Sequence, residues 1–189
     1  MSDYENAPAT TMLATHCCCC GRPLLDAVSV EAGIGPDCRK KHGFGEAQAA
    51  PDWAAVARLE LEGAWPTDPH AWANKLVHRI ACNRSSDDVP RFVACIHALG
   101  YRKLATTIAA QFGAVIVTEA DGMLLVAAPF NDEWNKAAHA NWWRWDGKAK
   151  VRRVPVADRG KLWAVLVRVY PGVLCVGTKT ARIIEAKAA

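Results

Sequence analysis

The spacing of apolar positions divides the chain into a helical part and a β-rich part. Between residues 52 and 112, apolar side chains recur every three or four positions, as in Trp72, Leu76 and Ile80, which is the period of one face of a helix. Gly113 is expected to end the last of these helices. The pattern predicts helices over residues 53–62, 69–80, 88–99 and 102–112.

After Gly113 the pattern changes to short runs of β-branched and aliphatic residues. Asp121-Gly122 and Asp146-Gly147 each lie between two such runs, which predicts two hairpins. The predicted elements, in order, are strands over 114–118 and 123–127, a helix over 131–140, strands over 142–145 and 150–154, a helix over 158–170 and a strand over 173–176. This order predicts an α+β fold with a small antiparallel sheet and helices on one face.

The segments between and before these elements complete the organisation. The first residues are small and polar without periodicity, which predicts a flexible tail, and an Ala- and Gly-rich stretch precedes the first predicted helix. We therefore expect a tail over 1–15, a cysteine-rich module over 16–45, a linker over 46–52, a helical segment over 53–112 and an α+β segment over 113–185.

The composition is that of a globular protein. Of its 189 residues, 51% are hydrophobic and 22% are charged, and no apolar run approaches the roughly 20 residues that a membrane-spanning helix needs. This excludes a membrane protein. The N-terminus lacks the basic and apolar regions of a secretory signal, so we expect the cytoplasm. In a reducing compartment, clustered cysteines more often bind metal than form disulfides.

Five of the eight cysteines fall in the N-terminal module. Cys17 and Cys20 are separated by two residues, a spacing that presents two sulfurs to one metal. Pro36 is expected to open a helix in which Cys38 and His42, four residues apart, share a face. Three thiolates and one imidazole make a closed tetrahedral zinc site, which would stabilise a segment with few large apolar residues.

Other interpretations of the cysteine run stay open. The fourth ligand could instead be His16, Cys18 or Cys19. An iron–sulfur cluster also suits cysteine-rich segments, and the run could be redox-active or incidental. Within the module, the motifs Cys17-x-x-Cys20-Gly-Arg and Gly-Ile-Gly-Pro-x-Cys38 resemble small zinc-ribbon or treble-clef-like modules of uncharacterised bacterial and phage proteins. That resemblance implies a bound metal and an origin in phage or mobile DNA.

Positive charge is concentrated in the C-terminal part. Residues 113–189 hold twelve basic and seven acidic residues, whereas residues 1–112 are close to neutral. Basic side chains can neutralise phosphates while exposed aromatic rings stack on unpaired bases. The residues expected to bind nucleic acid are Trp142, Arg144, Trp145, Lys148, Lys150, Arg152 and Arg153.

The commoner role of tryptophan is in the core, and we expect this of Trp143 and Trp163. Strict alternation of apolar and polar residues fails at Arg152 and Arg153, which predicts a β-bulge or an edge position there. A solvated basic surface without a ligand is the alternative for the charged residues.

The run from Pro129-Phe130 through Trp142-Trp143-Arg144-Trp145 to Tyr170-Pro171 is similar to the HepA-related domain of annealing helicases. The similarity would cover residues 114–185. It implies a small antiparallel sheet with two helices that recognises junctions between single- and double-stranded DNA. The chain departs from this pattern at Arg152 and Arg153, where the family usually has a tryptophan.

Motifs of catalysis are missing from the sequence. It contains no Gly-x-x-x-x-Gly-Lys-Ser/Thr phosphate loop, no His-Glu-x-x-His pair and no Gly-x-Ser-x-Gly elbow. We therefore expect a zinc-stabilised, non-enzymatic DNA-binding protein of phage or bacterial DNA metabolism that prefers single-stranded or branched DNA. Three alternatives remain. The first is a protein-interaction adaptor or inhibitor of a host or defence complex. The second is an RNA-binding protein, which would use the same chemistry, and the third is a nuclease whose site is assembled from distant carboxylates.

Overall fold

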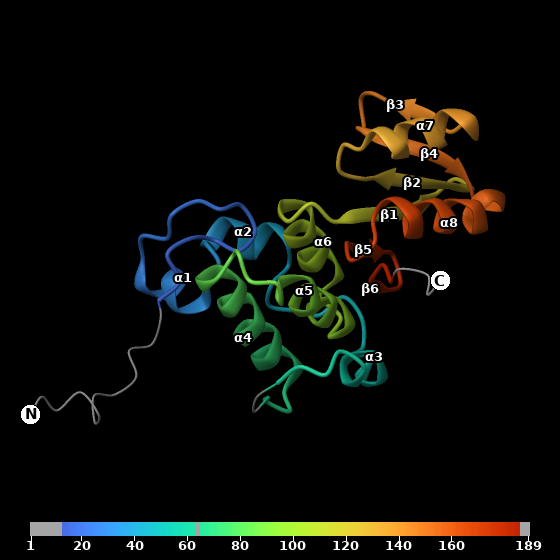
Figure 1. Cartoon of the computed structure of the whole chain (residues 1–189). Helices are drawn as coiled ribbons and strands as arrows, with labels where there is room; N and C mark the ends of the chain where they lie inside the picture. The colour runs from blue at the N-terminus through green and yellow to red at the C-terminus, as the bar shows by residue number, and fades with distance from the viewer. Residues whose placement is uncertain (1–12, 63–64, 186–189) are drawn as a thin grey trace, which may run out of the picture.

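The computed structural model describes residues 13–62 and 65–185 (Figure 1). Most of the expected flexible tail, residues 1–12, lies outside the described residues. The predicted α+β class is confirmed, because helices fill the first half of the chain and a six-stranded sheet lies in the second. None of the described helices has the length and apolar character needed to cross a membrane.

Five of the six helices described in the first half begin at a capping aspartate or with a proline in the first turn. Asp26, Asp52 and Asp68 each accept a hydrogen bond from the backbone N–H three residues later, which satisfies a donor that the first turn leaves unpaired. The helices are α1 (Ala27–Ala32), α2 (Pro36–Lys41), α3 (Trp53–Ala57), α4 (Pro69–Cys82), α5 (Val89–Ala98) and α6 (Arg102–Gln111). The prediction of a helix over 53–62 is wrong beyond Ala57, since Glu60 has a φ of 47°, outside the helical region.

The second half alternates strands and helices as expected, with one strand more. Its elements are β1 (Val115–Ala120), β2 (Met123–Ala127), α7 (Asp132–Ala140), β3 (Arg144–Asp146), β4 (Val151–Pro155), the 3₁₀ turn η2 (Val156–Asp158), α8 (Arg159–Val169), β5 (Leu174–Gly177) and β6 (Ala181–Ile183). The order in the sheet is β3-β4-β2-β1-β5-β6.

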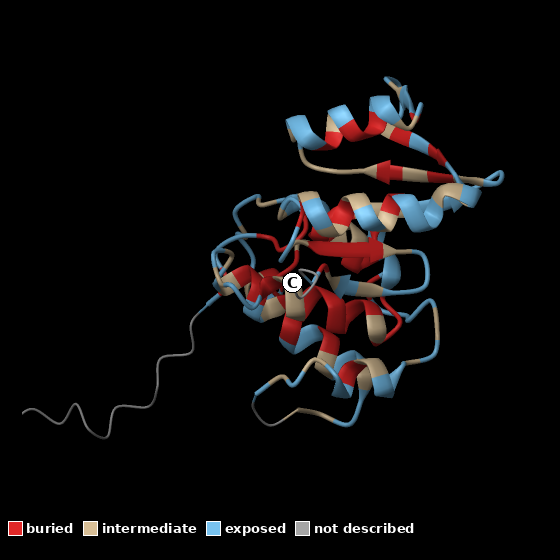
Figure 2. Cartoon of the chain, turned by 45° about the vertical axis from the view of Figure 1, so that its right-hand side comes forward, coloured by how far each residue is buried: buried red, intermediate tan, exposed pale blue. Residues whose placement is uncertain are grey.

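Two expectations about this sheet need correction. The sheet is not wholly antiparallel, because β1 and β5 pair in parallel, with Val115 opposite Cys175. Helices cover both faces there. Leu174 and Val176 belong to the core that includes α5 and α6, whereas Cys175 packs into the core beneath α7 and α8. Successive residues of a strand point to opposite faces, so β5 contributes to both cores. Figure 2 shows buried residues both on the helices and on the strands.

Candidate metal centre and candidate nucleic-acid interface

A tight turn brings Cys17 and Cys20 together. The Cys17 N–H donates to the carbonyl of Arg22 at 2.8 Å, and the Gly21 N–H donates to the carbonyl of Cys17 at 2.9 Å. Gly21 has a φ of 70°, a conformation that costs glycine little and other residues more. A β-bridge between His16 and Pro23 closes the turn. The spacing Cys-x-x-Cys therefore forms a turn that presents two sulfurs on one side.

Helix α2 supplies the third thiol. Pro36 occupies its first turn and Cys38 follows two residues later, as the sequence predicts. The sulfurs of Cys17, Cys20 and Cys38 all lie within 4.8 Å of one another. Cys17 is buried, Cys38 is half-buried and Cys20 is exposed. Three convergent thiols at this spacing can hold a metal ion, so the structure brings together the three cysteines that the sequence singled out.

The thiols of the cluster differ in the direction in which their surroundings shift the pKa. Hydrogen bonds from the thiols of Cys18 and Cys19 hold the pKa of Cys17 well below its usual range. Burial raises the pKa of Cys38 to about 12. A bound divalent cation would lower the pKa of Cys38, because it replaces the thiol protons and compensates the charge of the additional thiolates.

His42 lies outside the group of three thiols, and its hydrogen bonding determines which ring nitrogen is free to bind a metal. Its Nδ1 is 3.1 Å from the hydroxyl oxygen of Thr107, and that hydroxyl donates its proton to the carbonyl of Lys103 at 3.0 Å. The Thr107 oxygen must then accept from His42, so Nδ1 carries the proton and Nε2 keeps a free lone pair. Burial lowers the pKa of His42 and so favours the neutral ring. A neutral imidazole with its second nitrogen hydrogen-bonded is the usual form of a metal-bound histidine.

The other candidates for the fourth ligand, His16, Cys18 and Cys19, differ from His42 in their surroundings. Cys18 and Cys19 are buried, with their sulfurs 3.8 Å apart. Burial raises the pKa of Cys18, and the hydrogen bond with Cys17 raises that of Cys19. His16 is exposed, and its Nδ1 is 2.9 Å from the hydroxyl oxygen of Thr15. None of the three belongs to the close group of metal-ligating atoms found among the described residues.

The N-terminal cysteine module, residues 16–45, packs against the helical segment through contacts that the sequence analysis did not predict. The guanidinium of Arg84 donates to the carbonyl of Cys17 at 2.7 Å and lies 5.0 Å from the centre of the Phe112 ring. Gly33 packs against the backbone of α4, where an added Cβ would lie 2.8 Å from the Cα of His78. Since these partners are far apart in sequence, no local pattern predicts them.

The aromatic and basic residues predicted to bind nucleic acid divide into two groups. Trp142 is 90% exposed and Trp145 is 56% exposed. Both lie in or next to the β3–β4 hairpin with the exposed Arg144, Lys148 and Lys150. These three cations have no ion pair with any residue of the described ranges. We call the five residues the hairpin surface.

Arg152 and Arg153 have structural partners instead. Arg152 is only 7% exposed, and its guanidinium donates to the side-chain oxygen of Asn135 at 3.0 Å. Arg153 forms an ion pair with Asp146 at 2.7 Å. The predicted bulge or edge position is wrong: β4 lies between β3 and β2 in unbroken register. Along β4, Arg152 and Val154 both point inward, so Arg152 occupies an inward position of a regular strand.

The two tryptophans expected in the core differ. Trp143 is buried, and its indole N–H donates to Asp158 at 3.2 Å. Trp163 is half-buried and lies under the guanidinium of Arg182, 3.8 Å from the ring centre. Trp143 therefore lies in the core as expected, whereas Trp163 is partly open to solvent.

Comparison with known proteins identifies the N-terminal region alone. Residues 7–43 match the model of DUF6011, a family of unknown function, and this stretch contains all three clustered thiols. No curated protein and no solved structure matches the chain. The similarity of residues 114–185 to the HepA-related domain stays a prediction.

Proposed function

We propose that this protein is a zinc-stabilised, non-enzymatic nucleic-acid-binding protein that prefers single-stranded or branched DNA. Zinc is the metal whose ligand preferences suit three thiolates and one imidazole in a closed site. In this proposal Cys17, Cys20, Cys38 and the Nε2 of His42 bind the ion. A site with four protein ligands has no open position for a substrate, so the metal is structural.

The hydrogen bond from His42 to Thr107 provides a test of the fourth ligand. Thr107→Val removes the acceptor and keeps the side-chain shape, so we expect zinc affinity to fall about tenfold. Affinity is measured by competition with a chelating indicator. Thr106→Val is the matched control, since the Thr106 hydroxyl donates to the carbonyl of Arg102 on the same helix. Equal affinities of the two variants would show that His42 is not a ligand oriented by Thr107.

One observation carries the nucleic-acid proposal: an almost fully exposed tryptophan is held in an unfavourable backbone conformation beside cations that have no ion pair within residues 13–62 and 65–185. Trp142 has a φ of 59°, in the left-handed region that costs a bulky residue about 1–3 kcal/mol. Its exposed ring offers a stacking face, while Arg144, Lys148 and Lys150 can contact phosphates. Stacking on unpaired bases discriminates against a closed duplex, whose base faces are covered.

The test is binding of the zinc-loaded protein to single-stranded, duplex and forked DNA, and to single-stranded RNA, measured by fluorescence anisotropy over a salt series. We expect tighter binding to forked or single-stranded DNA than to duplex, with a logarithmic affinity that falls steeply with salt. If the protein binds RNA more tightly than DNA, the proposed ligand is RNA and not DNA. Absence of binding to every nucleic acid at low salt would refute the proposal and favour a protein partner.

A further inference from the structure

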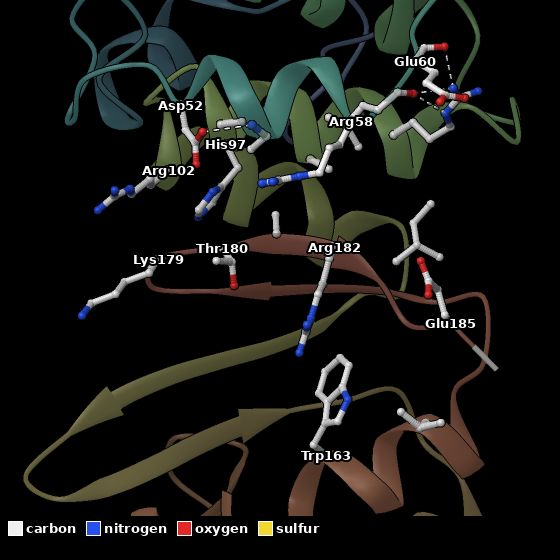
Figure 3. Close-up of a pocket in the computed structure, with 18 of the residues that line it drawn as sticks. Asp52, Arg58, Glu60, His97, Arg102, Trp163, Lys179, Thr180, Arg182 and Glu185 are labelled. Carbon is white, nitrogen blue, oxygen red and sulfur yellow. Dashed lines mark hydrogen bonds between the residues drawn. The ribbon is translucent and has the colours of Figure 1, made fainter. Parts of the chain in front are cut away.

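A basic cleft lies between the helical half of the molecule and the end of the sheet. It has a volume of 1210 Å³ and is bounded by α3 and α5 on one side and by the β5–β6 hairpin and α8 on the other. A second hollow of 700 Å³ shares four residues with it, Trp163, Lys179, Thr180 and Arg182. The two hollows therefore adjoin around the tip of the β5–β6 hairpin. Figure 3 shows residues that line the larger one.

Three cations line this cleft from two walls and have no charged partner in the described part of the chain. Arg58 and Arg102 extend from the helical wall, and Lys179 extends from the hairpin tip. All three are exposed, and none forms a hydrogen bond or an ion pair through its side chain with a residue of the described ranges. Asp52, Glu60 and Glu185 are the acidic residues that line the cleft. Of these, Asp52 caps α3 by accepting a hydrogen bond from the Ala55 N–H. Cations on opposite walls of one cleft can bind several negative groups of one ligand at once.

The hairpin that carries Lys179 is firmly positioned. The Gly177 N–H donates to the carbonyl of Thr180 at 2.7 Å, and the ring of His97 on α5 lies with its Nε2 3.1 Å from the carbonyl of Gly177. A carbonyl only accepts, so Nε2 donates and ties the hairpin to the helical core. Next to it, Arg182 stacks on Trp163. A guanidinium plane held on a ring presents its outer face to a flat group such as a base.

We propose that this cleft binds consecutive phosphates of a nucleoside-containing ligand, through Arg58, Arg102 and Lys179, with a base against Arg182. Those phosphates can belong to an unpaired nucleic-acid strand or to a free nucleotide. The choice of a strand rests on the proposed function, whereas the phosphate chemistry rests on the cleft alone. The cleft is separate from the hairpin surface, because no residue of that surface lines it.

The test compares two double variants that remove the same charge. Arg58→Ala with Arg102→Ala removes two exposed cations that line the cleft, and Lys136→Ala with Arg168→Ala removes two exposed cations that do not line it. Binding of ATP without magnesium and of a short oligothymidylate is measured by isothermal titration at low salt. We expect the cleft variant to bind at least about tenfold more weakly than the control variant, as the removal of two charge-assisted hydrogen bonds implies.

The outcomes separate the two ligand sources and the two proposals. Loss confined to the oligothymidylate assigns the cleft to a strand, and loss confined to ATP assigns it to a free nucleotide. Equal affinities of the cleft and control variants, or no binding of either probe by the wild type, would overturn the cleft proposal. If ATP binding needs Arg58 and Arg102 while no nucleic acid binds the wild-type protein, the cleft proposal stands and the proposed DNA function falls.

Discussion

Removal of the metal is expected to unfold the N-terminal module and to leave the sheet folded. Chelation, or the substitution Cys17→Ser, should increase amide hydrogen exchange over residues 13–45 to rates near those of an unfolded chain. Peptides from β1, β2 and β4 should keep their protection. Hydrogen exchange followed by mass spectrometry, with and without chelator, measures both regions in one experiment.

The size of this effect follows from how little else holds the module together. Its large fully buried side chains are few, with Ile34 the principal one, and α1 and α2 have six residues each, too few for stable isolated helices. Structural zinc contributes an apparent free energy of about 10–16 kcal/mol to small modules, which is comparable to the whole stability of a typical domain, about 5–15 kcal/mol. The contacts of Arg84 and Gly33 cannot replace a term of this size.

Cys82→Ser is the control for a general effect of losing a thiol. Cys82 is half-buried on α4 and lies outside the cluster of three sulfurs. We expect the Cys82→Ser variant to bind one metal ion per chain and to show the hydrogen-exchange pattern of the wild type. If the metal-free protein protects residues 13–45 as well as the metal-loaded protein does, the metal is not what folds this module.

The cluster of three thiols that could hold a metal was predictable from the sequence because local structure places these cysteines. The two-residue spacing of Cys17 and Cys20 requires only a turn, and Pro36 places Cys38 at the start of a helix. The orientation of His42 was not predictable, since Thr107 lies on α6, 65 residues away. Local spacing thus identified the thiols but not the hydrogen bond that determines which nitrogen of His42 can bind a metal.

The sheet shows the same division between local and distant information. Both hairpins follow from Asp-Gly turns between apolar runs, whereas the parallel pairing of β1 with β5 joins segments that are far apart along the chain. Strand β6 has three residues with Arg182 at its centre, a composition without a strand pattern of its own. It is defined by its pairing with β5.

Arg152 shows how a charged residue can mislead a prediction of binding. In sequence it belongs to a basic run beside tryptophans, which is typical of a phosphate contact. In the structure it occupies an inward position of β4, where Asn135 and the carbonyl of Trp143 accept its hydrogen bonds. Spacing held one clue, because Arg152 and Val154 are two residues apart and share a face. The partner on α7 could be known only from the fold.

Substitutions on the hairpin surface are expected to separate binding from folding. Trp142→Ala should weaken binding to single-stranded DNA about tenfold or more, because base–aromatic stacking contributes about 1–3 kcal/mol. Its melting temperature should not fall, since the ring is exposed. Phe130→Ala is the matched control: Phe130 is 85% exposed and lies outside this surface. Anisotropy titrations and thermal melts of both variants measure the two effects.

Charge removal from the same hairpin tests the phosphate contacts independently of stacking. Lys148→Ala with Lys150→Ala should weaken binding to every DNA and lower the slope of logarithmic affinity against logarithmic salt by about two, one for each phosphate that a lysine no longer neutralises. Arg152→Ala should instead lower the melting temperature, because it leaves Asn135 without its buried partner. An unchanged salt slope in the lysine variant, together with unchanged affinity in Trp142→Ala, would show that nucleic acid does not bind the hairpin surface. Binding that persisted in both variants would then have to come from another surface, and the basic cleft around Arg58, Arg102 and Lys179 is the first to examine.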